Sequence, residues 1–455
     1  MKFSQADSCG LAGCKGKFWD GRAILAPTSA LSQTGCRMNT PAPLPLSRAS
    51  GAWITLAILS GLNMLNYLDR YVMSAVLTPM QKEMNLSDAH AGWPASAFML
   101  GYFVSAPFFG YLGDRFPRKY LMLGGVIVWS LATAGGGLAH SFVQLLIIRG
   151  FVGVGEACFV TMGPSWISDL FAATRRNTAL TLFYVAIPFG SAIGFTIGGW
   201  FAERGEWREA LLWVGLPGIL LALSLLLLRE PPRGEADGLG EKAIARAEVG
   251  EIAGLLLNRR YSLLVWGYAA QTFAIGGFGI WGPTFLSRTH QYPVGEAATL
   301  FGAMLAGSGL LATLLGGFLA TKLRQRWSAG YVWVMALSMI VAVPVCFFAL
   351  LVGNATLSAI GLGISMFFLF LPTGPICSEM FEIVPVHLRA SAMALCTFII
   401  HLFGDFSSPS VVGQISTWTS SLQQGVLILP VVLVIGAMLW SVLICFTREP
   451  VEVEA

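Results

Sequence analysis

Long apolar stretches, separated by short polar segments, fill most of the chain. Each of about twelve stretches has roughly 20 residues or more, enough for a helix rising 1.5 Å per residue to cross a hydrocarbon core of about 30 Å. The stretches span residues 51–78, 89–113, 119–139, 142–170, 177–203, 208–228, 260–286, 295–321, 329–352, 355–383, 389–415 and 422–446. This pattern predicts an all-α membrane protein with twelve transmembrane helices.

The amino-acid composition points in the same direction. Of the 455 residues, 55% are hydrophobic and 11% are charged, whereas a soluble domain carries about 25% charged residues. The chain therefore lacks the polar surface that a water-soluble protein of this length needs. The net charge of +4 does not indicate nucleic-acid binding, because the basic residues lie in loops where they determine topology.

The basic residues of the connecting loops are unevenly distributed. Most follow the even-numbered stretches, and they include Arg115, Arg118, Lys119, Arg175, Arg259, Arg260, Lys322, Arg324 and Arg326. The opposite loops hold few, namely Lys82, Arg204, Arg208 and Arg288. Because cytoplasmic loops are enriched in Lys and Arg, both termini are expected in the cytoplasm. The mostly short loops favour a multi-pass protein of a bacterial inner (plasma) membrane.

The first 50 residues differ from the rest. They are rich in Gly, Ser, Ala and Pro and contain no apolar core long enough for a signal peptide. We expect a disordered N-terminal leader over residues 1–50, with Met38 as an alternative start. The eight cysteines of the chain show no spacing typical of a metal site. Those in apolar stretches are expected to pack as small core residues, and no cofactor is expected.

The longest hydrophilic interruption, residues 230–258, divides the chain into two sets of six stretches. Pro and Gly in "REPPRGEADG" end the preceding helix, and "EKAIARAEVGEIAGLLL" then places apolar residues on one face. This predicts a cytoplasmic linker with an amphipathic helix on the membrane surface; a plain linker is the alternative. The expected units are an N-terminal six-helix bundle (51–229), a C-terminal six-helix bundle (259–447) and a cytoplasmic tail (448–455).

Weak internal similarity supports this division. "GYLGDRFPRK" follows the second stretch and "GFLATKLRQR" the eighth, while "GPSWISDLF" closes the fourth and "GPICSEMF" the tenth. Such similarity between halves indicates an internal repeat. Two related six-helix halves, with a site between them near the midplane, are the plan of secondary transporters.

Four charged residues interrupt apolar stretches of the first half. Asp69 and Arg70 are adjacent, so on a helix they point about 100° apart and need partners on other helices. Arg149 and Glu156 are seven residues apart, which is about two turns and one face. A charge near the bilayer centre costs at least about 2.5–3.5 kcal/mol, so these residues are expected to form one neutral cluster.

Proton coupling is the function that this cluster favours. A buried carboxylate beside an arginine can exchange a proton for a salt bridge, and an arginine in the same space can hold an anion. We therefore expect Asp69 and Glu156 as proton sites, and Arg70 and Arg149 as substrate or coupling cations. The alternative is a static network that holds the first stretch against the fourth, although buried ion pairs stabilise proteins weakly.

A second polar segment, "HLFGDFSSPSVVG", lies in the eleventh stretch. His401 and Asp405 are four residues apart and share a helix face, so they are expected to interact as an outer gate or proton relay, or to serve packing alone. Pro409 is expected to interrupt the helix just beyond them.

Two further side chains are candidates for lining a cavity. Tyr67 lies in the first stretch and Gln271 in the seventh, and both offer polar atoms to a substrate. The seventh stretch is also rich in glycine and aromatic residues, with a break expected at Gly282–Pro283. Packing alone is the alternative role for this stretch.

The segment "GYLGDRFPRK" resembles the signature loop of the major facilitator superfamily, and the resemblance covers roughly residues 51–447. Pro117 stands where the family has glycine. The resemblance implies a gate-side charge network in this loop, and we expect a gating role for Gly110, Asp114, Arg115, Arg118 and Lys119. The alternative is that its basic residues only fix topology.

Within the superfamily, the chain is most similar to the Spinster (Spns) family. The similarity rests on "NYLDRYV", "GVGEACFVTMGPSWISDLF", "AQTFAIGGFGIWGPTFL" and "HLFGDFSSPSVVG", which lie in both halves. It implies alternating access and proton-linked movement of a lysophospholipid or a phosphorylated sphingoid base. The alternative is a proton-coupled symporter of organic anions such as sugar acids, because those symporters have a similar Asp-Arg step in helix 1 and Arg/Glu pair in helix 4.

Other classes of protein fit less well. An enzyme is not expected, because no nucleophile–base or metal constellation is visible beyond His401 and Asp405. A channel would fit the composition, but the two halves and the gate loop favour a transporter. The expected partners are an amphipathic or anionic small molecule, protons and membrane lipid, with no nucleic acid, and the chain is expected to act as a monomer.

Overall fold

The computed structural model describes residues 46–232, 251, 254–384 and 388–447. Within these ranges the chain is helical and contains no strand. The leader, most of the linker with its expected amphipathic helix, and the tail lie outside the described residues, so those expectations stay predictions.

The first half is made of seven α-helices and one short 3₁₀ turn. They are α1 (Leu46–Ala75), α2 (Leu77–Met84), α3 (Asp88–Arg115), α4 (Arg118–Gly136), α5 (Phe142–Leu170), α6 (Ala173–Glu203), α7 (Trp207–Ser224) and η1 (Leu225–Leu227).

The second half begins at α9, and several of its spans are divided into two segments. Its elements are α9 (Arg259–His290), α10 (Val294–Arg324), α11 (Gly330–Leu351), α12 (Ala355–Phe370), α13 (Thr373–Ile383), α14 (Arg389–Ile400), η4 (His401–Asp405), α15 (Ser408–Thr419), α16 (Leu422–Val426) and α17 (Ile428–Phe446).

Eleven helical segments of the described residues are long and apolar enough to cross a membrane. The twelfth span is α4, a 19-residue helix that begins with Arg118 and Lys119 and packs against α5 and α7. The predicted all-α fold with twelve transmembrane helices is thereby confirmed, and the predicted spans agree with the helices to within a few residues at most ends.

Polar residues mark the starts of several spans. Ser141 begins α5 with a capping box, in which its hydroxyl accepts from the backbone N–H of Gln144 and the Gln144 side chain accepts from the backbone N–H of Ser141. Asn258 caps α9 by accepting from the backbone N–H groups of Arg260 and Tyr261. These caps satisfy backbone donors that would otherwise have no partner at the start of a membrane helix.

Two helix breaks differ from those expected. The break expected at Gly282–Pro283 is wrong, because α9 runs through both residues, and Gly282 instead leaves room for the ring of Phe301. In the eleventh span the irregular residue is Gly404, which lies before the expected break at Pro409. Pro409 is in the first turn of α15, where a missing N–H costs nothing.

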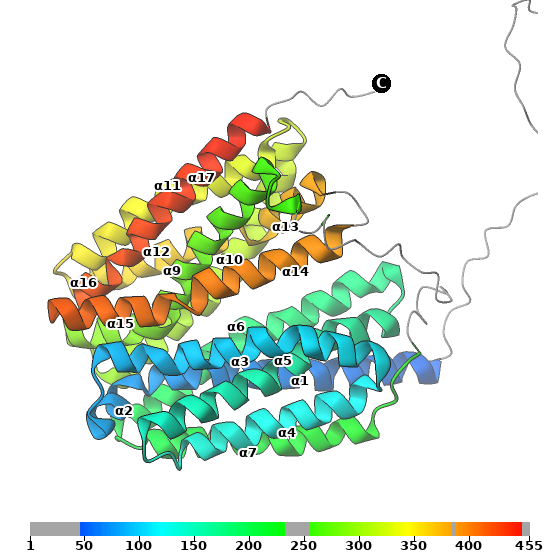
Figure 1. Cartoon of the computed structure of the whole chain (residues 1–455), viewed down its shortest axis with the longest axis horizontal. Helices are drawn as coiled ribbons and strands as arrows, with labels where there is room; N and C mark the ends of the chain where they lie inside the picture. The colour runs from blue at the N-terminus through cyan, green and yellow to red at the C-terminus, as the bar shows by residue number, and fades with distance from the viewer. Residues whose placement is uncertain (1–45, 233–250, 252–253, 385–387, 448–455) are drawn as a thin grey trace, which may run out of the picture. The chain divides into compact units, whose positions relative to one another are not determined.

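Each half packs mainly around its own helices (Figure 1). In the first half α1 packs against α6, and α3 and α4 pack against α5; in the second half α9 packs against α17, and α11 against α12. The main contacts between the halves are made by α3 with α15 and by α6 with α10. The predicted division into two six-helix bundles stays a prediction.

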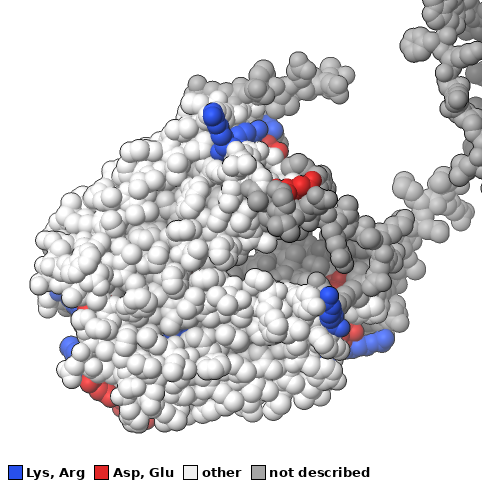
Figure 2. Space-filling model, in the orientation of Figure 1, with Lys and Arg blue, Asp and Glu red and all other residues white. Residues whose placement is uncertain are grey.

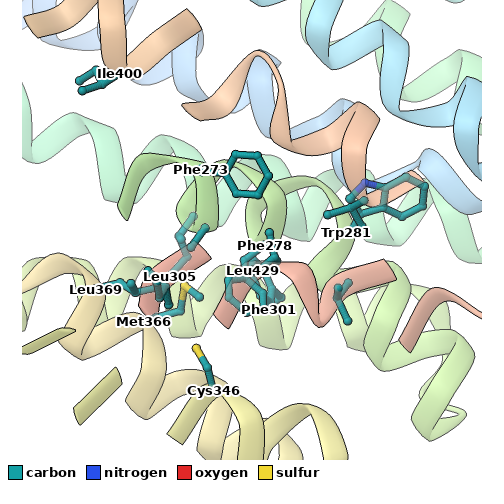
Figure 3. Packing of buried hydrophobic residues seen from close by; sticks show 14 of the residues in the cluster. Phe273, Phe278, Trp281, Phe301, Leu305, Cys346, Met366, Leu369, Ile400 and Leu429 are labelled. Atoms are coloured by element: carbon teal, nitrogen blue, oxygen red, sulfur yellow. The ribbon is translucent and has the colours of Figure 1, made fainter. Parts of the chain in front are cut away.

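Apolar side chains fill the second half. Phe278, Phe301 and Leu429 gather beside α9, and Trp281 lies against the helix segment that contains Pro409, whose carbonyl accepts from the indole N–H at 2.9 Å (Figure 3). Cys346 is buried in the same cluster, as expected of a core cysteine.

Charged side chains gather toward two ends of the surface in Figure 2 and leave a largely uncharged band between them. Such a band fits the hydrocarbon layer of a bilayer, because exposed charges are costly there.

Candidate functional site

The four charged residues predicted to form a cluster lie together in the first half. Asp69 and Arg70 come from α1, and Arg149 and Glu156 come from α5. Arg70 Nη2 lies 2.9 Å from Glu156 Oε2, and Arg149 Nη1 lies 4.0 Å from Asp69 Oδ1. The two adjacent residues of α1 therefore face different partners on α5, as helical geometry predicts.

The cluster is neutral and deeply buried. Asp69, Arg149 and Glu156 are almost completely shielded from solvent. Removing the charge of one member would leave a buried, unpaired charge on its partner, which is strongly unfavourable. The protonation of one group is therefore coupled to the position of the others.

Thr133 of α4 adds a hydrogen bond to this cluster. Its hydroxyl donates to Asp69 Oδ2, while Asp69 Oδ1 faces Arg149. The Asp69 carboxylate thus has partners on two other helices. A donor of this kind favours the charged form of the carboxyl group.

The two arginines differ in their access to solvent. The side chain of Arg70 is 18% exposed and that of Arg149 is 5% exposed. Tyr67 and Tyr102, which lie beside Arg70, are also partly exposed. Arg70 is therefore the more exposed of the two cations.

Aromatic side chains surround the two arginines. The Arg70 guanidinium carbon lies 4.9 Å from the ring centroids of Tyr67 and Phe98 and 5.5 Å from that of Tyr102. The Arg149 guanidinium carbon lies 5.0 Å from the ring centroid of Phe98. At these distances the rings attract the guanidinium groups electrostatically.

Sequence reasoning missed Phe98, Tyr102 and Thr133. The spacing of the two aromatic residues, four apart on α3, was an available signal because such residues share a helix face. Threonine in an apolar helix gives no such signal.

Glycines set the distance between α3 and α5. A Cβ atom at Gly153 would overlap the carbonyl oxygen of Phe98, and a Cβ atom at Gly101 would overlap that of Gly150. The two backbones can approach closely only because these positions lack side chains. This contact fixes where the Phe98 ring stands relative to both arginines.

His401 and Asp405 form the second predicted pair. His401 Nδ1 lies 3.0 and 3.1 Å from the two Asp405 carboxylate oxygens, and both side chains are about one-fifth exposed. They belong to a π-helical turn, η4, and the His401 ring contacts the Tyr102 ring of the other half at 5.8 Å between centroids. The pair therefore lies where the two halves meet.

The other two candidates for a cavity lining have different positions. Tyr67 is partly exposed and stands beside Arg70. Gln271 is buried, and its amide donates to the backbone carbonyl of Leu369. Gln271 therefore ties α9 to α12, and its predicted role in lining a cavity stays a prediction.

The predicted gate loop, residues 110–119, connects α3 to α4. Arg118 is buried and pairs with Asp169 at 2.7 Å and with Glu230 at 3.1 Å. The Glu230 carboxylate also accepts from the backbone N–H groups of Arg118 and Lys119. Glu230 therefore caps the start of α4, where the helix dipole favours a negative charge.

The remaining residues of the loop are less enclosed. Arg115 is exposed and its guanidinium lies 3.4 Å from the Tyr111 ring centroid. Gly110 faces the methyl group of Thr161, and the side chain of Asp114 lies outside the described residues. The interactions given above for Arg118 join parts of the first half, so a gating role across the halves stays a prediction.

A polar network joins the halves where α3 begins and α9 ends. Asp88 accepts from Arg288 at 2.7 Å, from Gln81 at 2.8 Å and from Ser416 at 2.5 Å. Thr417 accepts from the backbone N–H of Ala89 at 2.9 Å. We call Asp88, Arg288, Gln81 and Ser416 the Asp88 network; it closes this end of the interface between the halves.

Comparison with known proteins finds related sequences. A family model described as "Major Facilitator Superfamily" matches residues 59–409. The chain is 32% identical over 442 residues to "Protein spinster homolog 3" of Danio rerio, an alignment that covers 90% of this chain and 88% of that protein. It is 32% identical over 474 residues to "Sphingosine-1-phosphate transporter SPNS2" of Danio rerio, covering 95% and 93%.

Solved structures share the fold. A bacterial homologue of the human lysosomal transporter Spinster, in an inward-facing and unoccupied conformation, matches with a TM-score of 0.79 and 25% identity, covering 88% of this chain and 99% of that one. The same homologue in an inward-facing and occupied conformation matches with a TM-score of 0.76. The nucleoside transporter NupG matches in fold, with a TM-score of 0.66 and 15% identity.

Proposed function

The chain belongs to the Spinster family of the major facilitator superfamily, and we propose that it carries a lysophospholipid or a similar anionic amphipathic lipid across the membrane, coupled to protons. The protein is a multi-pass membrane transporter and not an enzyme. Proton coupling and the lipid nature of the substrate are proposals that go beyond the assignment to this family.

The Arg70–Glu156 ion pair carries this proposal. Glu156 is completely buried, whereas its partner Arg70 is partly exposed. A proton on Glu156 removes the negative charge that faces Arg70. The arginine then has one unpaired positive charge at a solvent-accessible surface, which an anionic head group can neutralise through charge-assisted hydrogen bonds.

The Glu156 carboxylate and the anionic head group therefore neutralise the same charge at Arg70, the first when Glu156 is deprotonated and the second when it is protonated. With both bound, the cluster is again neutral and the cost of burying it is low. With neither bound, the Arg70–Glu156 pair is restored. Because both of these states are neutral, they are the ones expected to change conformation, and this links proton movement to substrate movement.

The Asp69–Arg149 pair is a second, more enclosed acid–base unit beside the first. The two groups are 4.0 Å apart, which is long for a direct ion pair. Asp69 also receives the Thr133 hydroxyl. We assign Asp69 as a second proton site and Arg149 as the base that keeps it charged between transport steps.

A lipid substrate fits the surroundings of Arg70. The nearest groups, Tyr67, Phe98 and Tyr102, are aromatic. One cation among apolar rings suits a molecule with one charged head group and an apolar chain, whereas a sugar acid would need more hydroxyl-binding groups. A relative that is 32% identical carries the name of a sphingosine-1-phosphate transporter.

We also assign the orientation. The Asp88 network joins segments that lie on the side opposite to most loop lysines and arginines, so it is placed at the outer face, with both termini in the cytoplasm. We infer from the closed outer end that this conformation is inward-facing, and the match to a structure in an inward-facing conformation supports this inference. A bacterial inner membrane is the proposed location.

Proton flux in proteoliposomes tests the function. An internal pH dye would report flux after addition of a lysophospholipid or of a sugar acid, in the wild type and in Glu156→Gln. We expect flux with the lysolipid and none in the variant.

Three other results would change the assignment. Flux with the sugar acid alone would make the protein an organic-anion symporter with the same site. Flux that persists in Glu156→Gln would remove Glu156 from the mechanism. Lysolipid uptake without proton flux would overturn proton coupling.

A further inference from the structure

Aromatic rings contact the Arg70 guanidinium in addition to the Glu156 carboxylate. Tyr67, one turn earlier on α1, and Phe98 and Tyr102, one turn apart on α3, face its guanidinium at 4.9, 4.9 and 5.5 Å. We call these three side chains the aromatic cage.

Phe98 has a special place in the cage, because its ring serves both arginines. The guanidinium carbons of Arg70 and Arg149 lie 4.9 and 5.0 Å from its centroid. The ring is almost fully buried, and its backbone is fixed by the contact between its carbonyl and Gly153. The ring therefore cannot easily turn away from either cation.

The cage matters most when Glu156 is neutral. With Glu156 charged, the ion pair at 2.9 Å neutralises Arg70. With Glu156 protonated, the guanidinium loses that partner, and a buried charge without a partner is costly. A ring face attracts a free guanidinium more strongly than a paired one, because the paired one is already neutralised.

We propose that the aromatic cage, and Phe98 above all, is the positioning device that keeps Arg70 charged and in place for the head group while Glu156 carries the proton. This inference rests on the proposed function, because it assumes that Glu156 is protonated and that Arg70 binds an anion. It adds Phe98, a buried ring that acts through Arg70 and not by contact with the proton or the substrate.

The charged and titratable groups around Glu156 define what else affects its protonation. Arg70 and Asp69 face it from α1, together with Tyr67; Arg149 lies on its own helix, and Tyr102 faces it from α3. Changing the electrostatics of the Phe98 ring alters none of these charges. A response of the pH profile to such a change therefore reports the ring's effect on the two arginines that it faces, Arg70 and Arg149.

Stepwise fluorination of Phe98 tests the proposal. Incorporating mono-, di- and trifluorophenylalanine weakens the negative face of the ring and changes its volume little. We expect the KM for the lysolipid, measured at a pH that keeps Glu156 protonated, to fall at each step, by about tenfold in total, with the maximal rate little changed. The sign follows because a weaker ring face destabilises the free guanidinium more than one that is paired with a head group.

A matched position and a second background serve as controls. Phe278 is equally buried, in the apolar core of the second half, and its fluorination should leave the KM unchanged. In Arg70→Gln, the part of the fluorination effect that acts through Arg70 should disappear, and any effect that remains reports Arg149, which lies 5.0 Å from the same ring.

A second readout does not need a substrate. The pH midpoint of the inward–outward equilibrium, measured by distances between spin labels, should move to lower pH on fluorination, by up to about one unit for a tenfold effect. The sign follows because a weaker cage destabilises only the state with a protonated Glu156.

Two results would overturn the proposal. One is an unchanged KM and an unchanged pH midpoint in trifluorinated Phe98; the other is an equal response at Phe278. Failure of the proposed function looks different, because the lysolipid would then not be transported by the wild type. The pH midpoint would still show whether the cage acts on Arg70.

Discussion

Both halves contain a fully buried glutamate on their fourth span that pairs with an arginine on their first span. In the first half Glu156 pairs with Arg70 at 2.9 Å, and in the second half Glu379 pairs with Arg260 at 3.2 Å. The pairs differ in depth. Glu156 is at the middle of α5, whereas Glu379 is near the end of α13 and Arg260 is the second residue of α9.

The position of an ion pair along its helices determines whether water can replace a lost partner. The side chain of Arg260 is 36% exposed, twice the 18% of Arg70, so water can replace a lost carboxylate near the helix end. Arg70, in contrast, has the Asp69–Arg149 ion pair beside it and three aromatic ring centroids within 5.5 Å of its guanidinium carbon. We therefore interpret the Arg260–Glu379 pair as a static link between helices, and we propose that Arg70 in the first half can change partners.

The largest expected effect comes from neutralising each glutamate. Glu156→Gln should abolish proton-driven uptake, because the carboxyl group that exchanges the proton is gone. Glu379→Gln should keep proton-driven uptake and lower the stability by about 1–3 kcal/mol, the value of a hydrogen bond to a charged group. Proton-driven uptake is measured in proteoliposomes, and stability is measured by thermal unfolding, for both variants.

Equal loss of uptake in both variants, with equal unfolding temperatures, would contradict the distinction between the two pairs. Gln at position 379 keeps a hydrogen-bond acceptor for Arg260, so the variant is a matched control for removal of charge alone.

The Asp88 network is expected to affect conformation and not coupling. Asp88→Asn weakens charge-assisted bonds to Arg288 and Ser416, each worth about 1.5–3 kcal/mol. The outward-open population should rise by roughly tenfold or more, measured by distances between spin labels on the two halves. Glu296→Gln, an exposed acid in the first turn of α10, is the control and should change nothing.

Removal of the Thr133 hydroxyl should move the pH profile of transport. In Thr133→Val the Asp69 carboxylate loses a donor that favours its charged form, so Asp69 is protonated at higher pH and the midpoint shifts upward by about one unit. Thr161→Val is the control, because the Thr161 hydroxyl donates to the backbone of its own helix. A midpoint that stays in place would remove Thr133 from the proton site.

The smallest effect is expected outside the membrane spans. The indole N–H of Trp207 and the guanidinium of Arg208 bind Glu83 and lower the pKa of its carboxyl group below the ordinary value of 4.5. The lowered pKa stabilises the fold above pH 4.5, and this stability is lost as the pH falls through the pKa of the folded state. Glu83→Gln should flatten the acid side of the unfolding profile, whereas an unchanged profile would contradict this.

The sequence could predict the twelve spans and the four charges, because apolar length and charge within an apolar run are both visible without knowing any contact. Helical geometry also predicted that Asp69 and Arg70 face different partners, but it did not identify Glu156 as the partner of Arg70. The ring of Phe98 and the hydroxyl of Thr133 could not be found in this way. Their contacts depend on how α3 and α4 are rotated toward α1, and phenylalanine and threonine are common in membrane helices.

The two breaks expected at proline had different outcomes. The break at Pro283 is wrong, because α9 continues through it, whereas the eleventh span is interrupted between Asp405 and Ser408, just before Pro409. The actual irregularity is at Gly404, with φ −97° and ψ −105°. It lies in a π-helical turn, which depends on packing against neighbouring helices more than on any single residue type.

The irregular backbone at Gly404 divides the eleventh span into two helical segments that meet at a kink. On one side of it, α15 is docked to α3, where Gly92 lies against the carbonyl of Pro409. On the other side, α14 packs against α9 within its own half. A continuous straight helix would transmit a movement at one membrane face to the other face. A helix that is interrupted at Gly404 allows α14 to change its angle while α15 stays packed against α3 at the opposite face.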